Sequence, residues 1–384
     1  MWSKKHCLRM MESLPHDVVE LILERLPGNS LLRFKAVSKQ WNSTIQCQLF
    51  QERHLRQRQQ LGDPDVLMVS LRREDVINPD IESLTTLVLG SSSSPVKIHT
   101  PWEKENTDYL VSHSSCDGLV CLYNPHHSGF VVNPTTRWYR PLPVCELQQL
   151  IIDLRDSFYL LGYGLYKLGF GKDKFTGTYK PVWLYNSLEI GLENATTCEV
   201  FDFTTNAWRY VTPAAPYRVV HFPDPVYVDG SLHWFTDCQE TKVVSFDLHT
   251  EAFQVISKAP FAKNVNPFDI VMCNLDNRLC VSQQKWPNQV IWSFHSNNKT
   301  WEKMYSIDVT LSLVGKHICA LPPLALLGGK KKINNKKKKL LFYSRELCQN
   351  LVIHDPETKS YYAAFSTESY GYPVCYFQSL ISIK

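Results

Sequence analysis

The side chains that could do chemistry do not form a recognisable catalytic or metal-binding motif. The chain has 12 cysteines but no Cys-x-x-Cys pair, and its 13 histidines lack the spacing that zinc sites need. No Gly-x-Ser-x-Gly nucleophile elbow occurs. GFGKDKFTG at 169–177 lacks the Gly-Lys-Ser/Thr ending of a phosphate-binding loop, so a hairpin turn is the better interpretation. We therefore expect no catalytic residue, no metal and no cofactor, and cysteines that are reduced and mostly buried.

One lysine-rich segment carries much of the positive charge. KKKINNKKKK at 330–339 holds seven lysines, and without them the formal net charge falls from +4 to −3. A broad basic face of the kind that binds nucleic acid is therefore not expected. The segment has three interpretations that the sequence leaves open: a solvated hairpin tip, a nuclear-import patch, or a site for an acidic partner. The import patch would comprise Lys330, Lys331, Lys332, Lys336, Lys337, Lys338 and Lys339.

The location of the protein is suggested by its apolar segments. The N-terminal sequence MWSKKHCLRMMESLP lacks the apolar core of a signal peptide. The longest apolar run, ICALPPLALL at 318–327, is about half a membrane span and contains two prolines. We therefore expect no membrane association and a location in the nucleus, the cytoplasm or both.

A dense apolar cluster lies near the N-terminus, in LPHDVVELILERLPGNSLLRFKAVSKQWNSTI at 14–45. We expect a helix after Pro15 that ends at Pro27, a second helix capped by Asn29 or Ser30, and a third capped by Ser38. The apolar residues surround these helices instead of forming one stripe, and so small a unit seldom stabilises itself. The surplus apolar surface must meet either the rest of this chain or another protein.

This segment resembles an F-box. It has, in order, Leu-Pro, an acidic residue, an apolar helix, a second Leu-Pro, Ser-Leu-Leu-Arg and Val-Ser-Lys-x-Trp. The resemblance implies a small helical module that docks on the Skp adaptor of a cullin–RING ubiquitin ligase. By position, the expected adaptor contacts are Leu14, Pro15, Leu26, Pro27, Leu31, Leu32, Val37 and Trp41.

Five segments farther along the chain share one pattern: a strand that ends in a polar turn and is followed by an aromatic residue. They are FVVNPTTRW, EVFDFTTNAW, VSFDLHTEAF, WSFHSNNKTW and LVIHDPETKSY, and their closing aromatics are Trp138, Trp208, Phe253, Trp301 and Tyr361. The intervals are 70, 45, 48 and 60 residues, and two of them are close to the roughly 40–50 residues of a propeller blade. The longer intervals fit longer hairpin loops, at GFGKDKFTGTYK and GGKKKINNKKKK.

A second sequence signal recurs at a similar distance from the closing aromatic in three of these units. The dipeptides Asp117-Gly118, Asp229-Gly230 and Asp276-Asn277 lie 21 to 25 residues before the closing aromatic and predict tight hairpin turns. Two β-prone stretches remain outside the five units, LTTLVLG with VKIH at 84–99 and VCYFQSLISI at 374–383. Pairing them would give a sixth, composite blade and remove the free sheet edges. An open β-sandwich is the alternative.

This region resembles the plant F-box-associated domain, which is related to kelch-type propellers. The matching pieces include SCDGLVCLYN, FVVNPTTRWYRPLP, CEVFDFTTNAWRYV and VYVDGSLHWF, and the likeness is clearest over 110–260. The fold expected is an α+β multidomain chain: a small all-α F-box, then a mainly-β, kelch-like propeller of about six blades with the last one composite. The expected boundaries are an N-terminal extension at 1–10, the F-box at 11–50, a linker at 51–83 and the β domain at 84–384.

These resemblances imply a non-catalytic substrate-recognition subunit of an SCF-type ubiquitin ligase. The F-box would hold the Skp adaptor and the β domain a target protein, which the sequence does not identify. An adaptor-bound scaffold or inhibitor that delivers no target is the alternative. A propeller enzyme is a third hypothesis, and a bound metal or cofactor in the purified protein would reveal it.

Overall fold

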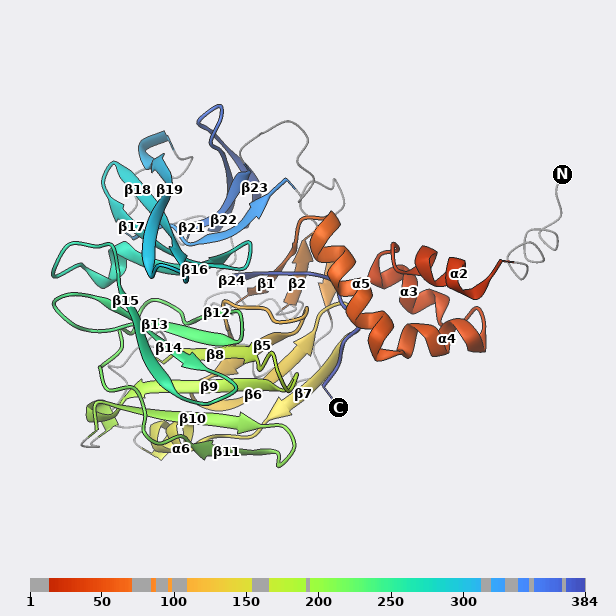
Figure 1. The fold of residues 1–384 in the computed structure, drawn as a ribbon, viewed down its shortest axis with the longest axis horizontal. Coiled ribbons are helices and arrows are strands. Elements are labelled where there is room, and N and C mark those ends of the chain that lie inside the picture. The colour runs from red at the N-terminus through yellow and green to blue at the C-terminus, as the bar shows by residue number, and fades with distance from the viewer. Residues whose placement is uncertain are drawn as a thin grey trace, which may run out of the picture.

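A small helical module followed by a mainly-β propeller makes up the chain, as the sequence predicts (Figure 1). The computed structural model describes residues 14–70, 84–87, 96–98, 109–153, 166–190, 194–311, 319–328, 338–344, 349–367 and 371–383. In Figure 1 the helices project from one side of the propeller, and the C-terminal segment runs between the two.

The helical module is built from α2 (His16–Leu23), α3 (Gly28–Phe34), α4 (Lys39–Gln46) and α5 (Gln48–Leu61). The predicted cap of α4 is confirmed, because Ser38 Oγ accepts the Trp41 N–H at 3.1 Å. The predicted cap of α3 at Asn29 or Ser30 is wrong. This helix starts earlier, at Gly28, and has no side-chain cap of its own. The first helix also ends before Pro27, at Leu23.

Five four-stranded antiparallel sheets each use four strands that follow one another in the chain, and each forms one blade. The first contains β4 (Leu110–Val111), β5 (Val120–Asn124), β6 (His127–Asn133) and β7 (Trp138–Leu142). The second contains β8 (Leu168–Lys172), β9 (Tyr179–Asn186), β10 (Thr196–Asp202) and β11 (Ala207–Tyr210). The third is β12 (Val226–Val228), β13 (Ser231–Phe235), β14 (Lys242–Asp247) and β15 (Phe253–Lys258). The fourth contains β16 (Ile270–Leu275), β17 (Arg278–Lys285), β18 (Asn288–His295) and β19 (Thr300–Asp308). The fifth contains β20 (Pro323–Leu327), β21 (Lys339–Ser344), β22 (Gln349–Asp355) and β23 (Ser360–Thr367).

The repeated sequence signals lie where they were predicted. Each closing aromatic is the first or second residue of the fourth strand in its sheet. One or two residues before each aromatic strand, the chain turns at a residue with positive φ, as Arg137 does at 61°. The others are Asn206, Glu251, Lys299 and Lys359. Asp117-Gly118, Asp229-Gly230 and Asp276-Asn277 also have positive φ at both positions, which is the geometry of the type I′ hairpin turn.

The two ends of the β region meet in one further sheet, with the order β24–β1–β2–β3. It contains β1 (Asp65–Ser70), β2 (Leu84–Leu87), β3 (Val96–Ile98) and β24 (Gly371–Tyr376). β24 pairs with β1 from Asp65↔Tyr376 to Ser70↔Gly371. The stretches at 84–99 and 374–383 thus share a sheet, but β1 lies between them.

β1 lies in the segment 51–83, which the sequence predicts to be a linker, so the structure differs from this prediction. The strand DVLMVS follows a polar helix and is a short apolar run without alternation, which hides its strand character. α5 also reaches Leu61, and residues 71–83 lie outside the described part of the chain.

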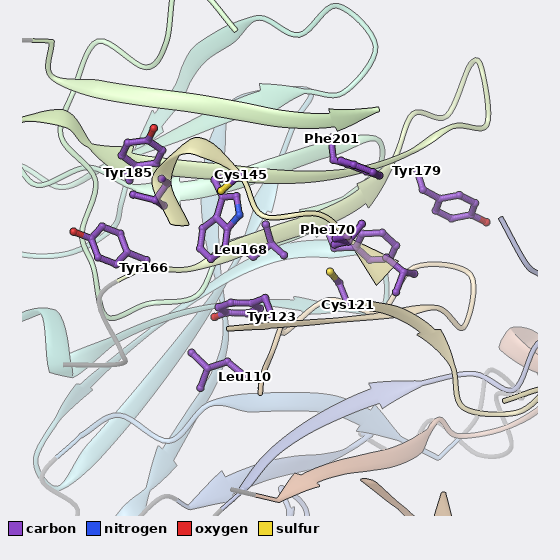
Figure 2. Packing of buried hydrophobic residues seen from close by; sticks show 14 of the residues in the cluster. Leu110, Cys121, Tyr123, Cys145, Tyr166, Leu168, Phe170, Tyr179, Tyr185 and Phe201 are labelled. Atoms are coloured by element: carbon purple, nitrogen blue, oxygen red, sulfur yellow. The ribbon is translucent and has the colours of Figure 1, made fainter. Parts of the chain in front are cut away.

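The first strands of the sheets contact one another around a centre. β8, β12, β16, β20, β24 and β4 touch in that order, and β5 contacts β8. Between neighbouring sheets lie apolar clusters, of which Figure 2 shows the one around Tyr123, Leu168, Phe170 and Phe201. Tyr123 meets Trp183 edge to face at 5.3 Å between ring centroids.

The glycines of GFGKDKFTG are needed for this packing. A Cβ at Gly171 would lie 2.4 Å from a ring carbon of Tyr227, and one at Gly169 would lie 2.9 Å from Leu232. Both positions belong to β8, whose backbone approaches the next sheet closely. The segment is a strand and a hairpin turn, in agreement with the interpretation from the sequence.

Candidate functional site

The outer surface of the helical module carries an apolar patch, which we call the α2 face. It consists of Leu14, Val18, Leu21, Ile22 and Val37, and each side chain is about two-fifths to half exposed. The α2 residues on the opposite side, Val19 and Leu23, are buried in the module. Several exposed apolar side chains on one small module mark a candidate surface for a partner.

The structure divides the eight predicted adaptor residues into three groups. Leu14, Pro15, Pro27 and Val37 are exposed, and Leu26, Leu32 and Trp41 are half-buried against the module's core. Leu31 has no exposed surface and belongs to the core. Its assignment as a surface contact is therefore corrected by the packing of α3.

Three residues of the α2 face are not among the adaptor contacts predicted from the sequence. Val18, Leu21 and Ile22 follow the helical spacing i, i+3, i+4, which places them on one side of α2. The same spacing was present in the sequence, but the side of α2 that faces the core could not be known without the fold. The structure therefore moves the centre of the candidate adaptor surface toward α2.

α5 fastens the α2 segment in place through polar contacts. The Arg53 guanidinium lies 2.6 Å from a carboxylate oxygen of Glu20 and 2.7 Å from one of Glu24. The buried His54 ring donates through Nε2 to the Leu26 carbonyl oxygen at 2.9 Å. Burial lowers the pKa of His54, so the neutral ring that makes this bond is favoured. These contacts hold the α2 face on a rigid support.

The propeller encloses a cavity of about 810 Å³ between its first strands. Phe222 and Phe268, which precede β12 and β16, line one end and contact each other with ring centroids 4.2 Å apart. Asp224, beside Phe222, lies 2.9 Å from His113 Nε2 and 3.1 Å from Lys167 Nζ. We call this end the aromatic mouth. It combines exposed rings with nearly buried charges, as ligand pockets commonly do.

The opposite end of the cavity is lined partly by the chain's own helical side. Gln59 of α5, Pro64 before β1 and Phe377 after β24 all contribute to it. The hairpin turns that follow β12 and β16, at Asp229 and Asp276, lie at this end as well. The aromatic mouth therefore opens at the ends of these strands away from the helical module.

At the end of the cavity opposite the aromatic mouth, lysines from neighbouring hairpins pair with the carboxylates of the turns. Lys172 Nζ lies 2.6 Å from Asp117, and Lys174 Nζ lies 3.2 Å from Asp229. Lys338, from the lysine-rich segment, lies 2.6 Å from Asp276 of the preceding sheet. Lys339 pairs with Asp355 at 3.2 Å, and the other five lysines of the predicted import patch lie outside the described residues. The segment joins the paired strands β20 and β21, as a hairpin loop does.

The other reactive side chains of the described ranges form no metal site and include several buried thiols. No group of three or more His, Cys, Asp or Glu side chains there is placed to hold a metal ion. Cys116, Cys121, Cys145, Cys198, Cys273 and Cys280 are free and buried, as the sequence predicts for most cysteines. Burial raises the pKa of the Cys116 and Cys145 thiols, so the unreactive thiol form is favoured. Among the helices of the described segments, none has the length and apolar character to span a membrane.

Comparison with known proteins gives a consistent result over both parts of the chain. A family model described as F-box domain matches residues 11–51, and one described as F-box associated beta propeller domain matches residues 68–383. An F-box/LRR-repeat/kelch-repeat protein of Arabidopsis thaliana is 69% identical over 390 residues, covering 100% of both chains. An F-box protein of the same plant is 52% identical and covers 97% of this chain and 100% of its own.

Similarity to solved structures is weaker. A chain in a nidogen/laminin complex is 10% identical with a TM-score of 0.45, and the match covers 82% of this chain and 99% of that one. A putative TolB from Agrobacterium tumefaciens is 8% identical with a TM-score of 0.40, over 82% and 99% of the two chains.

Proposed function

Because the chain belongs to the family of plant F-box proteins with an F-box associated beta propeller domain, we propose that it is the substrate-recognition subunit of an SCF-type ubiquitin ligase. The helical module binds a Skp-type adaptor, and the propeller binds a target protein. The chain itself makes and breaks no bond. It raises the effective concentration of the target's lysines near the ubiquitin-conjugating enzyme.

The observation that carries this proposal is the α2 face. Apolar side chains at two-fifths to half exposure cost solvation free energy unless a partner covers them. They lie within the residues that match the F-box model, and α5 holds them rigidly. Leu14, Pro15, Pro27 and Val37 complete the contact around Val18, Leu21 and Ile22.

The target-binding part of the proposal places the target at the aromatic mouth. Phe222 and Phe268 are 39% and 44% exposed, and the cavity beneath them is large enough for one or more side chains. The other end of the cavity is partly occupied by α5 and the segment after β24. In this account the sheet β24–β1–β2–β3, which we call the composite sheet, acts as the sixth blade, so that ring closure shapes the cavity. A target bound there lies on the far side of the propeller from the adaptor.

We also expect the protein to act in the nucleus, the cytoplasm or both. The lysines at 330–332 and 336–337 remain a candidate import signal. Lys338 and Lys339 are partly engaged by carboxylates of the propeller, so they contribute less to such a signal. No contact with nucleic acid or membrane is proposed.

The direct test is binding of the purified full-length chain to a purified Skp-type adaptor. We expect a stable one-to-one complex on size-exclusion chromatography and ubiquitin on captured target proteins in cells. A complex without any added ubiquitin on partners would favour the alternative, an adaptor-bound scaffold or inhibitor. No complex at all would reject both.

A further inference from the structure

The chain after β24 leaves the composite sheet and runs to the helical module (Figure 1). We call residues 377–383 the C-terminal strap. Leu380, in its middle, is only 4% exposed. It lies in the same apolar cluster as Val19, Leu23, Leu31, Ile45 and Phe50, which form the interior of the module. A residue distant in sequence therefore supplies part of the core of the predicted F-box.

Gln378 makes a polar link between the two parts of the protein. Its Oε1 accepts the Gly28 N–H at 3.1 Å, and its Nε2 donates to Asp65 Oδ2 at 2.7 Å. Gly28 is the first residue of α3, where the backbone N–H has no partner within the helix. Asp65 is the first residue of β1. Gln378 thus serves as the missing cap of α3 and connects it to the composite sheet.

The strap is also fixed to the first blade. The Asn133 side-chain amide is buried and donates to the carbonyl oxygens of Ser379 at 3.1 Å and Ile381 at 2.8 Å. At Gly118 a Cβ would lie 2.4 Å from the Phe377 carbonyl oxygen, so the turn has no room for a side chain. The backbone of the strap is therefore held against the first blade, and Leu380 packs in the core of the module.

The approach of the module to the propeller is equally close. A Cβ at Gly28 would lie 2.6 Å from Thr135 Cγ2, in the turn before β7. The module, the strap and the first blade thus meet at one junction. Rearranging any one of them would disturb the other two.

From this junction we infer that the adaptor-binding module of this chain is completed by its C-terminal strap. The module is too small to be stable with only its own core, so the loss of Leu380 and of the Gln378 cap leaves α2–α4 loosely packed. The α2 face is then presented only when the strap is seated, which requires β24 to be paired in the composite sheet. Adaptor binding is thereby coupled to closure of the propeller, and this regulatory step rests on the proposed function above.

The coupling has a consequence for how the ligase subunit matures. Gly28 and Gln378 are 350 residues apart, so the module is synthesised long before the strap that completes it. A chain that lacks a closed propeller cannot then occupy the adaptor. Only subunits able to hold a target would enter the ligase.

The test compares full-length variants of the strap. Leu380→Asp and Leu380→Ala change the buried residue, Gln378→Ala removes the cap, and Ser382→Asp is the matched control at an exposed position of the same segment. Hydrogen exchange measures protection in α2–α4 and in β8–β19 separately, and a binding assay measures affinity for a Skp-type adaptor. We expect Leu380→Asp to weaken adaptor binding by at least about ten-fold and to increase exchange in α2–α4, because a buried apolar contact is replaced by an unpaired charge. Leu380→Ala and Gln378→Ala should give smaller changes of the same kind.

The outcomes distinguish this inference from the proposed function. Unchanged exchange in α2–α4 with adaptor affinity within about two-fold of the wild type would overturn the inference while leaving the adaptor role intact. Equal loss of protection in β8–β19 for the mild Leu380→Ala variant would also overturn it, since the strap would then be a general stability element. If the wild type binds no adaptor, the proposed function fails, and increased exchange confined to α2–α4 would still support the structural role of the strap.

Discussion

Val18 and Val19 are neighbours in the chain, but the turn of α2 directs one side chain to solvent and the other into the core. Val19 is 7% exposed and packs with Leu23 in the core of the module, whereas Val18 is 39% exposed and belongs to the α2 face. Under the proposed function, the partner that covers Val18 is the Skp-type adaptor.

The first prediction separates this surface from the core. Val18→Asp and Ile22→Asp should weaken adaptor binding by about 2 kcal/mol or more, because apolar anchors dominate such interfaces. Thermal stability should change little, within about 0.5 kcal/mol, since both positions are exposed. Calorimetry with a purified adaptor measures the affinity, and thermal unfolding measures stability. Gln40→Asp, at an exposed polar position of α4, is the matched control.

Leu31 provides the contrast, because it is fully buried. Leu31→Asp should also abolish adaptor binding, but through unfolding of α2–α4, since an unpaired charge would be placed in the core. Loss of binding by Leu31→Asp with an unchanged helical signal in circular dichroism would contradict this assignment. It would return Leu31 to the contact surface predicted from the sequence.

The second prediction concerns the aromatic mouth. Phe222→Asp and Phe268→Asp should reduce capture of target proteins and leave adaptor affinity unchanged, because the two surfaces lie on different parts of the chain. Phe175→Asp is the matched control: this ring is 69% exposed on the turn after β8, away from the mouth. Quantitative mass spectrometry of captured proteins gives the comparison. Full target capture by a Phe222→Asp/Phe268→Asp double variant would show that the aromatic mouth does not bind the target.

The third prediction is that different lysines of the lysine-rich segment differ in their effect on stability. Replacing Lys330–Lys332, Lys336 and Lys337 by Ser and Gly should leave stability within about 0.5 kcal/mol, as expected for a surface loop. Lys338→Ser should cost more, up to about 1 kcal/mol, because it removes the half-buried pair with Asp276. Thermal unfolding tests both changes, and the nuclear fraction of a fluorescent fusion tests import. A large loss of stability in the first variant would show that this part of the segment is structural.

The fourth prediction is a pH dependence that originates at His233. Burial of this ring within the third blade lowers the pKa of His233 from 6.5 to about 4. The unfolded chain therefore binds a proton near pH 6.5 that the folded chain does not bind until about pH 4, and stability falls as the pH drops through this window. The expected loss is about 3 kcal/mol.

Urea unfolding at pH 7 and pH 5 tests this origin. His233→Leu should reduce the difference between the two pH values, whereas His295→Leu, on the surface of β18, should not. Parallel pH profiles for the wild type and His233→Leu would exclude His233 as the source. His54 and His354, which are also buried within the described residues, have pKa values lowered by burial and contribute in the same direction.

Much of the fold was predictable because its signals are local. The closing aromatics and the Asp-Gly turns are fixed by the backbone geometry of single hairpins, and Ser38 caps α4 through a contact three residues away. The strand β1 and the cap of α3 depend on partners about 300 residues or more distant, Tyr376 and Gln378. The inward position of Leu31 and the role of Leu380 depend on the same junction. Sequence patterns describe a face of a helix, but they do not reveal what covers it.

The measurement that tests the central claim most directly is ubiquitin on captured partners. Wild-type protein and the Val18→Asp/Ile22→Asp double variant are each expressed in plant cells under proteasome inhibition, and co-purifying proteins are quantified together with their ubiquitin-modified peptides. The account predicts that both forms capture the same targets, that only the wild type captures them with added ubiquitin, and that excess double variant lengthens their half-lives by competition. Partners that carry no added ubiquitin with the wild type, and whose turnover is the same with both forms, would contradict the account.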